Sequence, residues 1–186
     1  MIADYLTLNI LEMIEQSSED YHTKISLMGL LNNFSCPKNP GVEYFLRHNA
    51  ISFAQKKQSV THLVFKRDNM DELLGYFTLT IKPVSICTSV LSRTMEKKLL
   101  RVSTLNKDND TYTASAYLIA QLGKNFSLPP DERISGKALL GLADMTVKMA
   151  RHIVGGVVEF LECEDTPFLL DFYAQNGFKA FDRRIT

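Results

Sequence analysis

The stretch Arg133-Ile-Ser-Gly-Lys-Ala138 decides the fold, because it joins a predicted strand over residues 111–122 to a predicted helix over 131–152. Apolar residues recur at helical spacing after Gly136. A helix that begins at such a turn presents free backbone N–H groups and the positive end of its dipole, which suit a phosphate. Alone, R-x-x-G-x-A is a weak motif, since many α/β proteins place glycine at a helix start for packing reasons.

The sequence on either side predicts an α/β fold. Residues 60–66 and 73–81 are rich in Val, Thr, Leu and aromatic residues around a polar turn, which indicates an antiparallel hairpin. A mixed central sheet flanked by helices follows from this hairpin and the alternating elements after it. The other expected elements are a helical region over 2–34, a helix that starts at Asn39-Pro40, a variable excursion over 85–110, a strand over 154–161, a helix over 167–176 and a closing strand over 178–182.

Composition predicts one soluble domain over residues 1–186, with residues 2–34 as an N-terminal helical extension. The chain has 186 residues, 45% of them hydrophobic, and its 21 basic residues balance 21 acidic ones. No apolar stretch approaches the roughly 20 residues of a membrane-spanning helix. The N-terminus lacks the features of a secretory signal, so a cytoplasmic location is expected. The three cysteines and four histidines are dispersed without metal-ligand spacing, so no metal is expected.

Charge is unevenly distributed along the chain. Residues 51–107 carry ten basic and four acidic groups, whereas the segments on both sides are net acidic. The basic middle segment favours an anionic ligand if its lysines and arginines share one face. Solvated strand ends and turns would give the same pattern.

Three motifs in order resemble the GNAT superfamily of acetyl-CoA-dependent N-acetyltransferases. They are Gly75-Tyr-Phe-Thr-Leu79, the loop 133–138, and Phe172-Tyr-Ala-Gln-Asn-Gly-Phe178. The resemblance spans roughly residues 40–182. It implies a GNAT fold in which the fourth and fifth strands of the family, here 111–122 and 154–161, splay apart. Phe34-Ser-Cys36 before the G-Y-x-x-L motif is similar to the bacterial toxin-antitoxin branch of that family.

The resemblance implies where acetyl-CoA, the cosubstrate, would bind. Backbone amides of the loop would hold the pyrophosphate, and the strand end would pair with the pantetheine arm, with the thioester held in the splay. The loop residues are Arg133, Ile134, Ser135, Gly136, Lys137 and Ala138, and the strand-end residues are Leu122, Gly123 and Lys124.

Tyr173 matches the family tyrosine that protonates the departing thiolate. A phenol with its ordinary pKa of about 10 is protonated at neutral pH and can donate. The alternative is that Tyr173 only packs on the last helix, with Gly177 as its left-handed C-cap.

The attacking amine must also lose a proton. Glu164 and Asp165, just beyond the strand, are candidate acceptors, and the main candidates are Glu162 and Glu159. Strand alternation places these two on opposite faces, so at most one faces the cleft, and a solvated carboxylate remains open for each.

These observations predict an N-acetyltransferase that transfers an acetyl group directly to a primary amine of a small molecule or protein. Toxins of the similar branch acetylate the amino acid on charged tRNA. The net charge of zero disfavours that acceptor, because phosphate contacts supply most of the affinity for nucleic acid, although the basic residues between 56 and 101 keep it open. A catalytically silent module that binds coenzyme A or a protein is the alternative from another class. No membrane contact is expected, and a homodimer and an antitoxin partner stay open.

Overall fold

The computed structural model describes residues 4–17 and 21–182. The chain divides into two compact units, Met1–Thr80 with Ile119–Thr146, and Ile81–Leu118 with Val147–Thr186. Strands β3 (Gly75–Cys87) and β5 (Thr111–Lys124) and helix α6 (Gly136–Val154) run through both. Within the described ranges, none of the helices is long and apolar enough to cross a membrane. The single domain over 1–186 stays a prediction.

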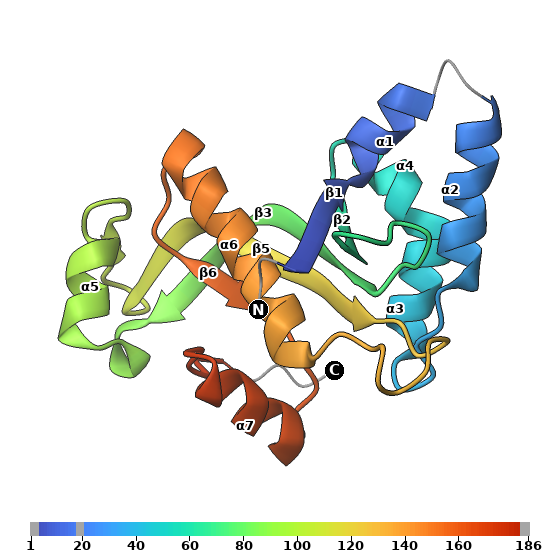
Figure 1. Cartoon of the computed structure of the whole chain (residues 1–186). Coiled ribbons are helices and arrows are strands. Elements are labelled where there is room, and N and C mark those ends of the chain that lie inside the picture. Colours follow the sequence, from blue (N-terminus) through green and yellow to red (C-terminus); the bar gives the residue numbers. More distant parts are fainter. Residues whose placement is uncertain (1–3, 18–20, 183–186) are drawn as a thin grey trace. The chain divides into compact units, whose positions relative to one another are not determined.

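Six strands form one hydrogen-bonded sheet in the order β1-β2-β3-β5-β4, with β6 paired to β5 (Figure 1). Strands β2 and β3 are antiparallel, with Val60 opposite Leu79 and Val64 opposite Gly75, which confirms the predicted hairpin. The pairs β1–β2 and β4–β5 are also antiparallel. The remaining bounds are Tyr5–Asn9 for β1, Val60–Lys66 for β2, Leu105–Asn106 for β4 and Glu159–Leu161 for β6.

The predicted helical region 2–34 is wrong at its start, because residues 5–9 form the edge strand β1. Tyr5 pairs with Lys66 and Asn9 with His62, so pairing with a distant strand prevails over the local helical spacing. Helix α1 (Ile10–Ser17) begins where the Asn9 side-chain oxygen accepts the Leu11 N–H at 2.9 Å. Residues 2, 3 and 18–20 lie outside the described residues.

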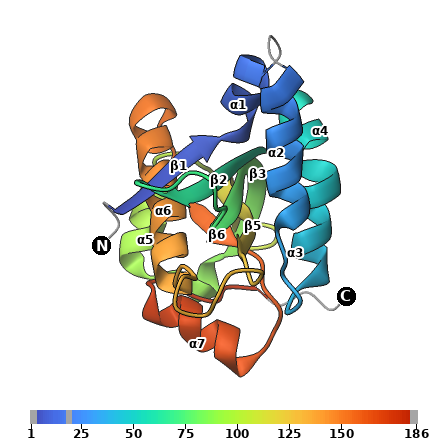
Figure 2. The same ribbon diagram turned by 45° about the vertical axis from the view of Figure 1, so that its right-hand side comes forward.

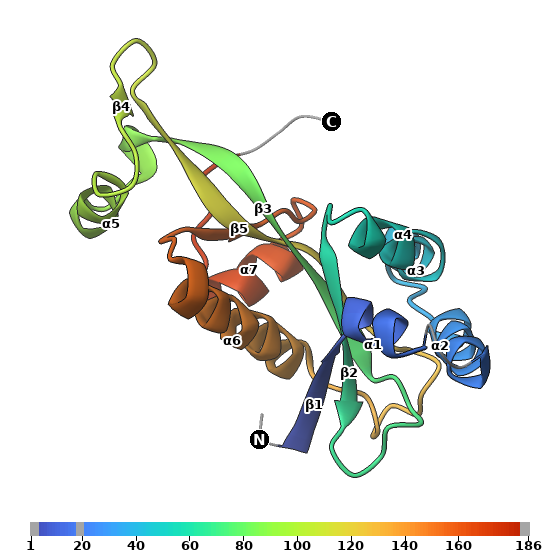
Figure 3. The ribbon, with the colours of Figure 1, turned by 90° about the horizontal axis from the view of Figure 1, so that it is seen from above.

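Helices α1 and α4 (Ala50–Gln55) pack against β2 in the first unit, and α2 (Tyr21–Asn33) and α3 (Pro40–Tyr44) lie on the same side of that strand (Figure 3). Helix α2 runs beside the stretch made of α3, a π-helical turn η2 (Phe45–Asn49) and α4 (Figure 2). Asn39 caps α3 and Pro40 occupies its first turn, as predicted. Buried side chains from these helices and the adjacent strands form one core, which includes Leu31, Phe34, Val42, Leu46, Ala50, Leu63 and Tyr76.

In the second unit, the predicted strand 154–161 shortens to β6. Helix α6 extends to Val154 and ends at two glycines with positive φ, Gly155 at 78° and Gly156 at 95°. The Tyr117 hydroxyl donates to the Gly155 carbonyl at 2.6 Å, and a Cβ on Gly156 would lie 2.8 Å from the Tyr117 ring. The chain therefore turns around Tyr117 before it pairs with β5, where the Tyr117 N–H donates to the Val158 carbonyl.

The segment expected to be a variable excursion is ordered within the second unit. It contains the end of β3, a 3₁₀ turn η3 (Thr88–Val90), helix α5 (Arg93–Leu99) and β4, and the basic run of residues 93–98 lies on α5 (Figure 3). Helix α7 (Pro167–Gln175) agrees with the prediction, and Thr166 caps it. The predicted closing strand 178–182 is wrong, because these residues make no strand pairing in the described chain.

Candidate functional site

The loop Arg133–Ala138 lies at the start of α6 in the first unit. Ser135 caps the helix, because its Oγ accepts the Ala138 N–H at 3.1 Å and its carbonyl accepts the Leu139 N–H at 3.0 Å. Helix α6 therefore begins at Gly136, later than the predicted start at Asp131. The first turn carries Lys137 and no acidic residue, so the positive end of the dipole keeps its attraction for an anion. This arrangement suits an anionic group such as a phosphate, and the binding of acetyl-CoA here stays a prediction.

Arg133 orders the loop that precedes the helix. Its Nε donates to the Leu128 carbonyl at 2.7 Å, and one terminal nitrogen donates to the Phe126 carbonyl at 2.9 Å. The next residue, Ile134, is buried in the core with 1% of its surface exposed. Of these two residues, the Ile134 side chain is therefore closed to a ligand, whereas the Arg133 guanidinium keeps its positive charge.

The strand end Leu122–Lys124 is in the same unit as this loop. A Cβ on Gly123 would collide with a Val42 methyl and would lie 3.0 Å from the Tyr76 ring. Only glycine fits where β5 passes so close to α3, so packing alone explains this residue. The Lys124 amine lies 5.3 Å from the centroid of the Phe126 ring. The pairing of this strand end with pantetheine stays a prediction.

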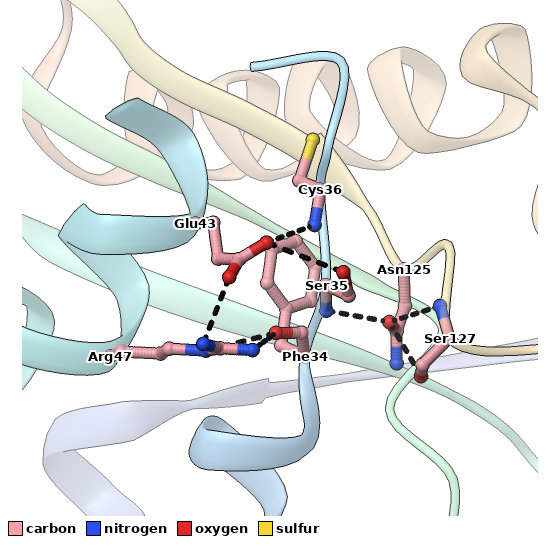
Figure 4. Close-up of polar contacts among 7 residues, drawn as sticks. All are labelled: Phe34, Ser35, Cys36, Glu43, Arg47, Asn125 and Ser127. Carbon is pink, nitrogen blue, oxygen red and sulfur yellow. Dashed lines mark hydrogen bonds and ion pairs between the residues drawn. The ribbon is translucent and has the colours of Figure 1, made fainter. Parts of the chain in front are cut away.

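A partly buried polar network, not predicted from the sequence, holds the segment Phe34–Cys36 between α3 and the end of β5 (Figure 4). The Asn125 side-chain oxygen accepts the Ser35 N–H at 3.0 Å, and its amide nitrogen donates to the Leu73 carbonyl at 2.9 Å. On the opposite side, Glu43 accepts the Cys36 N–H at 2.7 Å. The motif Phe34-Ser-Cys36 is therefore held by side chains from two distant parts of the first unit.

Arg47 completes this network, as Figure 4 shows. It forms an ion pair with Glu43 at 2.8 Å and donates to the Phe34 carbonyl at 2.6 and 3.0 Å. The bond from the Cys36 N–H, together with the Arg47 charge, lowers the pKa of Glu43. Arg47 follows Glu43 by four positions, and this helical spacing is the sequence signal that could have revealed the pair.

Tyr173 lies on α7 in the second unit, half-buried between aromatic neighbours. Its ring packs edge-on against Phe172 at 5.1 Å and Phe178 at 6.0 Å between centroids. Burial, with a smaller contribution from Cys163, raises the pKa of Tyr173 above its ordinary value. The phenol therefore holds its proton at neutral pH and has the protonation state of a general acid.

The F-Y-x-x-x-G-F motif also ends α7. The Phe178 N–H donates to the Tyr173 carbonyl at 3.0 Å and the Gly177 N–H to the Ala174 carbonyl at 3.1 Å, with Gly177 at φ 90°. These bonds form a Schellman motif, and the Tyr173–Phe178 contact is its usual hydrophobic accompaniment. The predicted left-handed cap at Gly177 is confirmed. Packing at Tyr173 and a catalytic role for its hydroxyl are compatible, because the cap uses the backbone and the ring.

The two candidate bases differ in environment. Glu159 on β6 forms an ion pair with Arg151 at 3.2 Å, and only 8% of its side-chain surface is exposed. Glu162 lies just past the end of β6 and is exposed. Glu159 is thus nearly buried beside Arg151, whereas the Glu162 side chain is exposed, and a role as base stays a prediction for both.

The predicted residues fall into two groups. Leu122–Lys124 and Arg133–Ala138 belong to the first unit, whereas Tyr173 and Glu162 belong to the second. Two hollows of about 320 and 400 Å³ lie in the first unit outside the predicted residues. The first is lined in part by Asp71, Glu72 and Asn125, and the second by Tyr44, Arg47 and His48.

The strand order, the helix that follows the R-x-x-G-x-A loop and the helix that ends in the F-Y-x-x-x-G-F motif define a class: the chain has the GNAT fold. Solved structures with this fold match most of the chain, which confirms the predicted fold and its likeness to bacterial toxins. No protein-family model matches the sequence, and none of the curated proteins matches it.

Three of these structures show what the chain is similar to. AtaT complexed with acetyl-methionyl-tRNAfMet has a TM-score of 0.63 and 18% identity, covering 83% of this chain and 82% of its own. A bacterial toxin has a TM-score of 0.61 and 18% identity, and the match covers 97% of this chain and 83% of the toxin. A tyrosine-to-phenylalanine variant of AtaT, bound to the C-terminus of the antitoxin AtaR and acetyl-CoA, has a TM-score of 0.53 and 19% identity, covering 80% and 75%.

Proposed function

We propose that the protein is an acetyl-CoA-dependent N-acetyltransferase of the toxin type, and that its amine acceptor is the amino acid carried by a charged tRNA. The observation that carries the proposal is the fold shared with AtaT complexed with acetyl-methionyl-tRNAfMet over 83% of this chain. A variant of the same toxin binds acetyl-CoA. The net charge of zero disfavours charged tRNA as the acceptor. We give the shared fold more weight than this argument, because the charge at a binding site can differ from the total charge of the protein.

The binding of acetyl-CoA is supported by the chemistry of the α6 N-terminus. The free N–H groups of a helix N-terminus are donors suited to the pyrophosphate, and here Ser135 caps one of them and no carboxylate lies in the first turn. Lys137 adds a positive charge in that turn. We assign the pyrophosphate to Arg133–Ala138 and the pantetheine arm to Leu122–Lys124.

The proposed reaction is direct acyl transfer. The neutral amine attacks the thioester carbonyl carbon, the C–N bond forms, and the C–S bond breaks as the tetrahedral intermediate collapses. The thiolate takes the proton of the Tyr173 hydroxyl, and the amine proton passes to Glu162 directly or through water. The α-amino group of an aminoacyl ester has an unperturbed pKa near 8 at most. It therefore loses its proton more readily than a lysine side chain, which makes modest base assistance sufficient.

Two sets of acceptors test the proposal. The protein is incubated with labelled acetyl-CoA and either a panel of charged tRNAs or a panel of small amines and lysine peptides, and products are identified by mass spectrometry. We expect an N-acetyl group on the amino acid of at least one charged tRNA. Acetylation of small amines or peptides alone would assign the protein to the other acceptor class. If acetyl-CoA does not raise the melting temperature of the protein, it does not bind, and the assignment as an acetyl-CoA-dependent enzyme is wrong.

The role of Tyr173 is tested by Tyr173→Phe, which removes only the hydroxyl. We expect kcat to fall by roughly 10²- to 10⁴-fold, the usual contribution of general acid catalysis. The melting temperature should change little, because the ring contacts that end α7 remain. Tyr44→Phe, at a tyrosine with 59% of its surface exposed, is the matched control and should keep full activity.

A protein partner is part of the same proposal. A toxin with this fold is bound to the C-terminus of its antitoxin, and we propose that an antitoxin binds this chain as well. Co-expression with the neighbouring open reading frame, followed by size-exclusion chromatography, tests the assembly and separates it from a homodimer.

A further inference from the structure

Three positively charged side chains gather around one aromatic ring in the first unit. The amine of Lys38 lies 5.5 Å from the centroid of the Phe126 ring, that of Lys124 lies 5.3 Å from it, and the Arg133 guanidinium carbon lies 5.1 Å from it. All three distances are within the roughly 6 Å at which a ring attracts a cation. Residue 38 is far in sequence from residues 124 and 133, so the fold, not a local basic run, brings these charges together.

Among the residues that the structure describes, none of these three charges has a carboxylate partner. Arg133 donates to two backbone carbonyls, and in the described ranges Lys38 and Lys124 form no ion pair. The carboxylate of Glu43, on the adjacent segment, is already engaged by Arg47 and by the Cys36 N–H. Three like charges this close repel one another, and the attraction of the ring offsets only part of that repulsion.

Hydrogen bonds hold the backbone around the ring, and they fix the positions from which the three charged side chains extend. The Phe126 N–H donates to the Ser35 carbonyl at 2.7 Å, and Arg133 binds the Phe126 carbonyl. The ring itself packs against the core of the first unit. Lys38 follows the segment Phe34–Cys36 that Asn125 and Glu43 hold in place.

We propose that Lys38, Lys124 and Arg133, gathered around Phe126, form a site for a backbone phosphate of the RNA acceptor. The inference rests on the proposed function and adds residues that bind the acceptor. A phosphodiester carries the negative charge that the cluster lacks, and ammonium and guanidinium groups are its usual partners. Lys124 and Arg133 are also among the residues assigned to acetyl-CoA, whereas Lys38 is not, so the assignment of the site to the acceptor depends on Lys38. The phosphates of coenzyme A have the same chemistry and are the competing ligand.

The test measures binding of each ligand separately. The RNA probe is a fluorescein-labelled acceptor-stem minihelix with a single-stranded 3′ end. It carries no amino acid, so its binding does not depend on acetyl transfer. For Lys38→Ala we expect affinity for the minihelix to fall about three- to tenfold. The slope of log K against log salt should fall by roughly 0.7 to 0.9, the value of one lost phosphate contact. The Kd for acetyl-CoA should stay within about twofold.

Two further variants separate an organised site from total charge. Lys97→Ala removes an exposed lysine of α5 in the second unit and should leave minihelix binding unchanged. Phe126→Leu keeps every charge but removes the ring, and should weaken minihelix binding while a melting curve confirms that the variant folds. Equal losses in Lys38→Ala and Lys97→Ala would overturn the site. A loss of acetyl-CoA affinity without a loss of minihelix affinity would assign it to the coenzyme instead.

The two proposals fail in different ways. If charged tRNA is not acetylated but the minihelix binds through Lys38, the site stands and the acceptor chemistry is wrong. If charged tRNA is acetylated and Lys38→Ala changes neither minihelix affinity nor salt slope, the proposed function stands and this site is wrong.

Discussion

Replacement of Asn125 by leucine should destabilise the first unit strongly, although the two side chains are nearly equal in size. Only 3% of Asn125 is exposed, and its side chain acts as both a hydrogen-bond donor and an acceptor. It accepts the Ser35 N–H at 3.0 Å and donates to the Leu73 carbonyl at 2.9 Å. Leucine offers neither bond and fills the space that water would need to replace them.

The expected cost follows from the groups left without partners. The Leu73 carbonyl belongs to a residue that is 3% exposed, and the Ser35 N–H is half-buried. A buried polar group without a partner costs about 1–3 kcal/mol. The Ser127 groups, which also bind Asn125, belong to an exposed residue and can turn to water. We therefore expect a loss of about 3 kcal/mol in the free energy of unfolding, allowing for the partial exposure of Ser35.

Urea unfolding followed by circular dichroism measures this loss, because the chain has no tryptophan for fluorescence. Asn32→Leu, at an exposed position near the end of α2, is the control and should change the stability by less than about 0.5 kcal/mol. Hydrogen exchange of the Ser35 amide gives a local reading and should accelerate in Asn125→Leu. A loss below about 0.5 kcal/mol, or unchanged exchange at Ser35, would show that this network does not hold the segment.

Other predictions follow from single contacts. Burial lowers the pKa of His62 to about 4, so the unfolded chain binds a proton between pH 6.5 and 4 that the folded chain does not. Stability should fall by up to about 3 kcal/mol as the pH drops through that window, and melting curves of His62→Phe should lose this dependence. Gly156→Ala should cost about 1–3 kcal/mol, more than Gly155→Ala, since both have positive φ but only Gly156 abuts Tyr117; thermal melts compare them. Because the pKa of Tyr173 is raised, this residue should cause no downturn in kcat/KM below about pH 10. A downturn near neutral pH that disappears in Tyr173→Phe would contradict its assignment as a general acid that is protonated at neutral pH.

Elements with strong local signals could be predicted from the sequence. The hairpin around residues 67–72 and the capped helices at Asn39-Pro40 and Pro167 depend on contacts between near neighbours, and the structure has all three. The edge strand Tyr5–Asn9 depends instead on a partner more than fifty residues away. Its leucines at alternate positions continue into the helical spacing of α1, so periodicity alone could not locate the boundary.

The polar network of the first unit shows a second limit. Asn125 follows a predicted strand, and Glu43 lies in a predicted helix, but no spacing in the sequence relates either to Ser35 or Cys36. Their partners are main-chain groups, which every residue has, so the sequence carries no mark of the pairing. The loop Arg133–Ala138 was found because its signal, a glycine-containing turn before an amphipathic helix, is local.

Charge gives the sharpest contrast between sequence and fold. Net charge determines the electrostatic field at distances beyond about 10 Å, where salt screens most of it. At that range a neutral chain does not attract a polyanion. Binding at contact depends on the charges within a few ångströms of a phosphate. Lys38, Lys124 and Arg133 belong to net-acidic segments of the sequence, and yet the fold places all three around Phe126. A neutral protein built this way should bind RNA slowly, without long-range steering, but with a salt slope set by its few direct contacts.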